Sequence, residues 1–190
     1  TAMAELAGGA AAPAAETKAS SEIKDLLPLL DKRGLECLNQ DSKHPITHAV
    51  EEPLRNDDAV FLSSDCDAQL LINIRFQQSV KIHSISIKAL SADNAPKSIK
   101  IFSDPINLGF DEAEERQGTQ AIDLSPEQVA DGAVIPLKFV KFQSVTSLAL
   151  FVGENHSGAD KTVIHSLRLF GCPRDQCNMK DWDKVKKTGD

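Results

Sequence analysis

The stretch FLSSDCDAQLLINIRF at residues 61–76, continued by VKIHSISIKAL at residues 80–90, decides the fold of this chain. Apolar side chains occupy every second position from Leu70 to Phe76, which is the period of a strand with one face in a core. The opposite face of that strand carries Leu71, Asn73 and Arg75. In the second block the apolar parity switches between Ile82 and Ile85, and a one-residue bulge there would restore inward facing.

Shorter runs repeat this alternation further along the chain. Their members are Ile99 and Ile101, Ile122 and Leu124, Val140 and Phe142, Leu148, Leu150 and Val152, and His165, Leu167 and Leu169. Many short strands separated by polar turns indicate an all-β sandwich or barrel. With eight Phe, one Trp and no Tyr, the core is expected to be filled mainly by Ile, Leu and Val.

Short helical connectors and a strap accompany the predicted strands. SPEQ at residues 125–128 has the capping-box arrangement with Pro at the first helical position, and Gly132 would end that helix. DEAEER at residues 111–116 predicts another short helical turn. In LLPLLDKRGLECLNQ at residues 26–40, Pro28 prevents a regular helix, so the apolar Leu residues predict a strap packed on the core.

Composition limits the classes of partner. The formal net charge of -7 disfavours a phosphate backbone, so we expect no nucleic-acid binding. No apolar run approaches the roughly 20 residues that cross a bilayer, so we expect no membrane association. Ala-rich residues 1–21 are predicted to be a disordered low-complexity tail, and residues 22–190 one domain, with residues 173–190 as a C-terminal extension. We expect a cytoplasmic and nuclear monomer.

The cysteines offer two interpretations. Cys172 and Cys177 form a C-x4-C pair that lacks the second pair of a structural zinc site, so incidental thiols are favoured over metal binding. An intramolecular disulfide is possible at that spacing, but reduced thiols are expected in a cytosolic protein. Core packing is the expected role of Cys37 and Cys66.

Other clusters resemble sites but have simpler explanations. Asp65-Cys66-Asp67 could supply calcium ligands, yet a polar turn before a buried strand explains the residues as well. Residues 111–116 carry four carboxylates, which are expected to be solvated. The histidines are expected to be exposed or half-buried, and Pro45 argues against one helix holding both His44 and His48. We therefore expect no enzyme activity, no catalytic or metal-binding residues and no cofactor.

Several separated blocks, in order, resemble the PITH domain, the C-terminal proteasome-interacting domain of thioredoxin-like proteins. Besides residues 26–40, 61–76 and 80–90, they are PKSIKIF at 96–102, FDEAEERQGTQAIDL at 110–124 and PLKFVKFQSVTSLALFV at 136–152. The resemblance implies a jelly-roll-like β-sandwich of the galactose-binding superfold, and association with the regulatory particle of the 26S proteasome. The redox motif of a thioredoxin domain, C-x2-C, is absent from these 190 residues, so the resemblance implies only the interaction domain.

A non-catalytic adaptor of the proteasome is thus the leading expectation. Its partner-binding residues are predicted in the C-terminal segment, where aromatic and Met anchors stand among charges: Met179, Trp182, Lys184, Lys186 and Lys187. Two alternatives stay open. One is a β-sandwich that binds a small ligand or carbohydrate, and the other is a thiol redox protein that uses Cys172 and Cys177.

Overall fold

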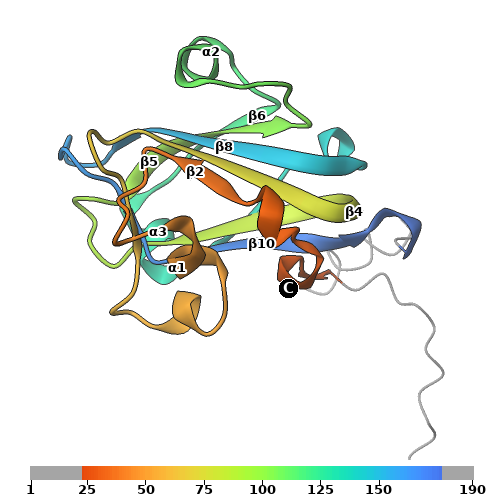
Figure 1. The fold of residues 1–190 in the computed structure, drawn as a ribbon, viewed down its shortest axis with the longest axis horizontal. Coiled ribbons are helices and arrows are strands. Elements are labelled where there is room, and N and C mark those ends of the chain that lie inside the picture. The colour runs from red at the N-terminus through yellow and green to blue at the C-terminus, as the bar shows by residue number, and fades with distance from the viewer. Residues whose placement is uncertain (1–22, 177–190) are drawn as a thin grey trace, which may run out of the picture.

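Two antiparallel layers of strands face each other across an aliphatic core, and the long strand β4 (Leu70–Lys88) belongs to both (Figure 1). A computed structural model describes residues 23–176 of the chain. The first half of β4 pairs with β2 and β8, and its second half pairs with β10 and β7. β4 bends between these halves, which places its two ends in opposite layers.

The strands of each layer follow from these pairings. The first layer contains β2 (Glu36–Leu38), the first half of β4, β8 (Val145–Asn155), β5 (Pro96–Ser103) and β6 (Gln120–Asp123). The second contains β1 (Lys24–Asp25), β10 (Ser166–Pro173), the second half of β4 and β7 (Val134–Pro136). A separate short pair joins β3 (Leu62–Ser63) to β9 (Val163–Ile164).

The inward face of β4 builds the core, as its alternation predicts. Ile72 and Ile82 are 1% and 0% exposed, and both belong to one cluster with side chains of every neighbouring strand. Along β10, Phe170 pairs with Ser84 but the next residue, Gly171, pairs with Ile82. One extra residue of β4 is therefore accommodated at this point, and the predicted bulge between Ile82 and Ile85 is confirmed.

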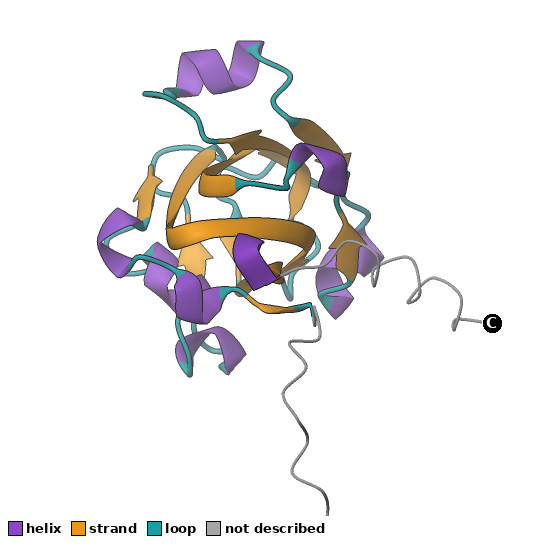
Figure 2. Cartoon of the chain, turned by 90° about the vertical axis from the view of Figure 1, so that its right-hand side faces the viewer, coloured by secondary structure: helices purple, strands orange, loops and turns teal. Residues whose placement is uncertain are grey.

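Short helices lie around the strands (Figure 2). They are α1 (Ile46–Val50), α2 (Phe110–Glu115), α3 (Pro126–Asp131) and the 3-10 turns η1 (Leu27–Leu29), η2 (Lys32–Gly34), η3 (Leu54–Asn56), η4 (Phe139–Lys141) and η5 (Arg174–Gln176). Within residues 23–176, no helix has the length and apolar character needed to cross a membrane. The helices are connectors, as expected.

The N-terminal strap is also confirmed. Leu26 and Leu30 are buried on either side of η1, which contains Pro28 at its second position. The amide of Leu26 donates to the carbonyl of Leu169 at 2.8 Å, and Leu30 bridges to Phe76. The strap is thereby hydrogen-bonded to β10 in the second layer and to the first half of β4 in the first layer.

The capping box at α3 is formed as the sequence predicts. The Ser125 hydroxyl accepts from the amide of Gln128 at 3.2 Å, and the Gln128 side chain accepts from the amide of Ser125 at 3.0 Å. Gly132 ends the helix at φ 64°, a left-handed conformation that glycine adopts without strain.

Removing this cap gives a first testable result. Ser125→Ala is expected to lower the free energy of unfolding by about 1 kcal/mol, and the melting temperature by about 2–4 °C, because the amide of Gln128 loses its acceptor. Thermal unfolding followed by circular dichroism measures the change. Ser125→Asp restores an acceptor and should melt close to the wild type; equal melting of the alanine variant would contradict the role of the cap.

Two expectations from the alternation are wrong. Val140 and Phe142 do not lie on a strand, because residues 139–141 form η4 and β8 begins only at Val145. In a 3-10 turn, positions two apart face different sides, so Val140 is 69% exposed whereas Phe142 is fully buried. Residues 70–76 and 80–88 are also one continuous strand rather than two.

Candidate functional site: a groove on the outer face of the first layer

The outer face of the first layer changes from apolar to polar along its strands. At one end Leu38, Leu71 and Phe151 stand side by side on β2, β4 and β8. Ala113 of α2 and Leu108 pack on this end and bury it. The next rows across the strands are polar on β2 and β4, and they are not covered by α2.

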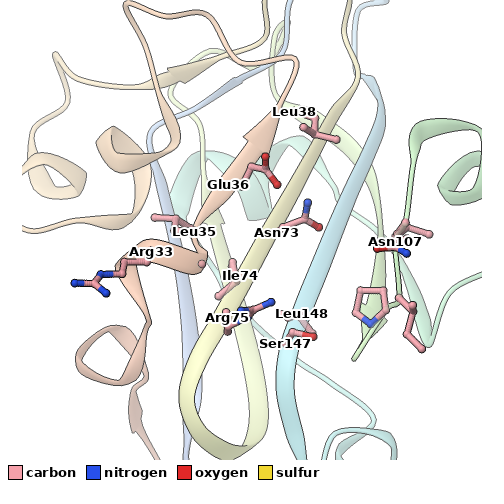
Figure 3. A pocket seen from close by; sticks show the side chains of 14 residues that line it. Arg33, Leu35, Glu36, Leu38, Asn73, Ile74, Arg75, Asn107, Ser147 and Leu148 are labelled. Atoms are coloured by element: carbon pink, nitrogen blue, oxygen red, sulfur yellow. The ribbon is translucent and has the colours of Figure 1, made fainter.

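The uncovered rows form the floor of a groove of about 790 Å³, named here the sheet-face groove. Its lining comprises residues 33–36 and Leu38, Asn73, Ile74 and Arg75 of β4, residues 105–108, and Ser147 and Leu148 of β8. Figure 3 shows Glu36, Asn73 and Arg75 between the two walls and Asn107 on the facing wall, whereas the guanidinium of Arg33 points away.

The register of the strands fixes these side chains in rows. Glu36 of β2 pairs directly with Asn73 of β4, and Arg75 pairs directly with Ser147 of β8. Glu36, Arg75 and Asn107 are exposed, and Asn73 is half-buried. Within residues 23–176, none of these four side chains makes a hydrogen bond or an ion pair. The groove therefore presents a carboxylate, a guanidinium and two amides that are free to bind a ligand.

The wall at residues 104–107 is held in one conformation. The carboxylate of Asp104 accepts from the amides of Thr146 and Ser147 at 2.9 and 2.8 Å, and its own amide donates to the Ser147 carbonyl at 2.8 Å. Asp104 and Asn107 have φ values of 46° and 47°, which their short polar side chains tolerate. As a result, Ile106 is displayed at the rim with 84% of its surface exposed.

The opposite wall rests on Arg75. The amide of Asp31 donates to the Arg75 carbonyl at 2.8 Å, and the Asp31 carboxylate caps η2 by accepting from the amide of Arg33. A Cβ atom on Gly34 would lie 2.5 Å from the Cβ of Arg75, so the backbone at Gly34 sits directly against the base of that side chain. Both walls are thus fixed relative to the floor.

The partner-binding residues predicted from the sequence cannot be compared with this groove. Met179, Trp182, Lys184, Lys186 and Lys187 lie outside the described residues, and their role stays a prediction. The outward parity of Asn73 and Arg75 was visible in the sequence, but Glu36 and residues 104–107 were missed. The only signal for the loop was Asp104-Pro105 followed by Asn107, which is typical of a turn.

The cysteines fall into three environments. Cys37 faces the core, and burial, followed by the nearby Glu36 carboxylate, raises the pKa of its thiol to about 12, so its predicted packing role is confirmed. Cys66 is exposed, which contradicts the same prediction for that residue. Cys172 is disulfide-bonded and 4% exposed, so the prediction of a reduced thiol is wrong for this residue. Cys177 lies outside the described residues.

The acidic turn at residues 65–67 has a structural role, as the simpler interpretation expected. The Asn39 side chain donates to the Asp67 carboxylate at 2.8 Å and to the Gln69 carbonyl at 2.7 Å, and it accepts from the amide of Cys66 at 3.1 Å. Within the described part of the chain, no group of three or more His, Cys, Asp or Glu side chains could hold a metal ion. Asp111, Glu112, Glu114 and Glu115 of α2 are exposed.

The histidines pack rather than converge on a ligand. His44 precedes α1 and stacks on Phe61 at 4.2 Å between ring centroids, whereas His48 lies inside α1, so the predicted effect of Pro45 is confirmed. His165 is buried, with 8% of its surface exposed, so the expectation of an exposed or half-buried residue is wrong there. Burial lowers the pKa of His165, Lys88 acts in the same direction, and Asp58 opposes them. Burial thus favours the uncharged form of the His165 ring.

Comparison with known proteins gives matches along most of the chain. The model of the PITH domain family matches residues 16–187. Thioredoxin-like protein 1 of Schizosaccharomyces pombe is 39% identical over 164 residues, which are 83% of this chain and 55% of that protein. PITH domain-containing protein 1 of Xenopus laevis is 32% identical over 145 residues, 75% of this chain and 66% of that protein. The chain thus spans just over half of the first relative and under two thirds of the second.

Solved structures share the fold at low identity. A CBM32 domain of a family 31 glycoside hydrolase from Clostridium perfringens matches with a TM-score of 0.53 and 14% identity, over 75% of this chain and 94% of that chain. Another CBM32 domain from the same organism, solved in complex with GalNAc-β-1,3-galactose, matches with a TM-score of 0.56 and 11% identity. The match covers 78% of this chain and 100% of that chain. At these identities the likeness concerns the fold alone, and it confirms the predicted galactose-binding-like jelly roll.

Proposed function

The chain belongs to the PITH domain family, and from this premise we propose that it is a non-catalytic protein-interaction module that associates with the regulatory particle of the 26S proteasome. The proposal is supported by the family match over residues 16–187 and by the 39% identity to a thioredoxin-like protein. The same proposal places the module in the cytoplasm and nucleus, where it would meet that partner. Disulfide reductase activity is not part of it.

The single observation that carries the interaction role is the sheet-face groove. Its exposed polar side chains, Glu36, Arg75 and Asn107, have no partner among residues 23–176, and its walls are fixed by hydrogen bonds to β4 and β8. A binding surface gains affinity when its groups are already positioned, because less conformational entropy is lost on association. The groove therefore has the organisation of a recognition surface.

A retention experiment tests the proposed function. The full chain is immobilised and incubated at low salt with purified 26S proteasome or, separately, with the isolated 20S core particle, and the bound subunits are identified by mass spectrometry. We expect regulatory-particle subunits to be retained from the first sample and the core particle alone to be lost in washing. Absence of regulatory-particle subunits, or equal retention of the isolated core, would overturn the proposal.

The predicted role of the C-terminal segment is tested with the same assay. A variant that lacks residues 178–190 removes Met179, Trp182 and the three lysines together, and its melting temperature is compared with that of the full chain. Reduced retention at an unchanged melting temperature supports a partner-binding role for the segment. Undiminished retention would show that the segment does not bind the partner and that the rest of the domain does.

A further inference from the structure

Two opposite charges stand at a fixed separation on the floor of the sheet-face groove. Glu36 is directly opposite Asn73, and Arg75 follows two residues along β4 on the same face. Diagonal neighbours of this kind have Cα atoms about 7–8 Å apart. Among the ion pairs of residues 23–176, none joins Glu36 to Arg75. The groove therefore contains a separate acidic and basic position, with the Asn73 amide beside them.

This separation matches one ligand in particular. Side chains on one face of an extended polypeptide recur about every 6.6–6.8 Å, because alternate residues point the same way. An extended segment with a basic and an acidic residue two positions apart can therefore place one charge on Glu36 and the other on Arg75. The amides of Asn73 and Asn107 each offer a donor and an acceptor, which suit the main-chain groups of such a segment.

The charge balance argues against segments of a single sign. The floor of the groove carries one negative charge, on Glu36, and one positive charge, on Arg75, because the guanidinium of Arg33 is directed away from the floor. A purely acidic segment would meet the Glu36 carboxylate and a purely basic one would meet Arg75, and like charges brought together in an interface are unfavourable. A segment of mixed charge can place its basic residue near Glu36 and its acidic residue near Arg75, so that each pair of charges is attractive.

The rim supplies an apolar contact next to these charges. Ile106 is 84% exposed on a loop that Asp104 fastens to β8, and Leu35 lines the opposite wall. The loop keeps two residues at positive φ, a conformation that costs free energy unless surrounding contacts hold it. Ile106 is thus held at the rim by contacts within the chain.

We propose that the sheet-face groove binds an extended segment of a partner protein in which a basic and an acidic residue stand two positions apart. The basic residue pairs with Glu36, the acidic residue pairs with Arg75, and an apolar side chain of the segment packs on Ile106. This inference rests on the proposed function, because the partner that provides the segment is the regulatory particle.

Charge-reversed variants test the inference with purified 26S proteasome as the probe. Glu36→Arg and Arg75→Glu are each expected to weaken retention at least about tenfold, because one charge of the segment then faces a like charge. Glutamate keeps the Cβ, Cγ and Cδ atoms on which Gly34 rests, so the fold should be preserved; melting curves verify this. Lys138→Glu changes an exposed residue outside the groove and alters the net charge as Arg75→Glu does, so it is the matched control for that variant and should bind like the wild type.

Photocrosslinking identifies the segment. Ile106 is replaced by p-benzoylphenylalanine in the full chain, the complex with the 26S proteasome is irradiated, and the crosslinked peptide is sequenced by mass spectrometry. We expect a regulatory-particle peptide with a Lys or Arg and an Asp or Glu at positions i and i+2. A peptide without that pair, or a crosslink to residues 177–190 of this chain, would overturn the inference.

The outcomes separate the two proposals. If the wild type is retained and both charge-reversed variants are retained equally well, the groove is not the docking surface, whereas the proposed association with the regulatory particle stands. If the wild type itself is not retained, the proposed function fails and the partner named here fails with it. Weakening by both groove variants but not by Lys138→Glu supports the groove.

Discussion

Replacing Gly171 with alanine is expected to lower the free energy of unfolding by about 3 kcal/mol and the melting temperature by about 6–12 °C. Gly171 lies on β10 opposite the bulge of β4, where the two backbones approach closely. A Cβ atom added at Gly171 would stand 1.9 Å from the carbonyl oxygen of Lys81 and 3.1 Å from the Cα of Ile82. Because these atoms belong to the backbone, no side chain can rotate away to make room.

A second glycine provides the control for this result. Gly109 precedes α2 at a φ of -101°, and a Cβ atom there would meet nothing within 4 Å. Gly109→Ala should therefore cost less than about 1 kcal/mol, the usual range for a helix cap. Thermal and urea unfolding of both variants give the comparison. Equal melting of Gly171→Ala and the wild type would show that the strands can separate at the bulge without loss of stability.

Replacing Arg55 with methionine should destabilise the domain to a similar degree, by about 3 kcal/mol. The Arg55 side chain is only 4% exposed, and its Nη2 atom donates to the carboxylate of Asp25 at 2.7 Å and to that of Glu52. Asp25 belongs to β1 and Arg55 to η3, so this contact fastens the strand that precedes the strap to η3. Methionine fills the same space but leaves the carboxylate of Asp25, itself 25% exposed, without its cation.

The pH dependence of stability distinguishes loss of this ion pair from simple loss of packing. The hydrogen bond from Arg55, followed by its charge, holds the pKa of Glu52 below its ordinary value. A carboxyl group with a lowered folded-state pKa stabilises the fold above its unfolded pKa, and that contribution is lost as pH falls through the folded value. In Arg55→Met this acid-side loss should be weaker.

Melting temperatures measured from about pH 3 to pH 7 cover this window, since an unperturbed Glu titrates near 4.3. Glu52→Gln is the matched variant, because it removes the titrating group while Arg55 keeps Asp25 as a partner. Both variants should flatten the acid side of the profile. A profile of Arg55→Met parallel to that of the wild type would show that Arg55 stabilises the fold without acting on Glu52.

Features set by neighbouring residues could be predicted from the sequence. The alternation at residues 70–76, the parity switch before Ile85 and the Ser125 capping box each depend on side chains a few positions apart, and the structure confirms all three. The error at Val140 has the same local origin, since an apolar residue two positions before Phe142 resembles a strand but also fits a 3-10 turn.

The groove could not be predicted because its parts come from distant segments. Arg75 and Asn73 read as an ordinary solvent-facing side of a strand, and nothing in that strand indicates that Glu36 lies beside Asn73. That register depends on pairing between β2 and β4, and the second wall depends on Asp104 reaching the first residues of β8. Non-local pairing of this kind is not encoded in any short window of the sequence.

The pairing of β1 with β10 also governs when the domain can be completed during synthesis. Lys24 of β1 is the partner of Gly171 of β10, so the hydrogen bonds between β1 and β10 can form only after β10 has been synthesised. A ribosome delivers the chain from the N-terminus, and contacts between residues so far apart form late. Until β10 has emerged, the apolar Leu residues of the strap have only part of their binding surface. During synthesis the strap therefore lacks its contacts with β10 until residues 166–173 have left the ribosome.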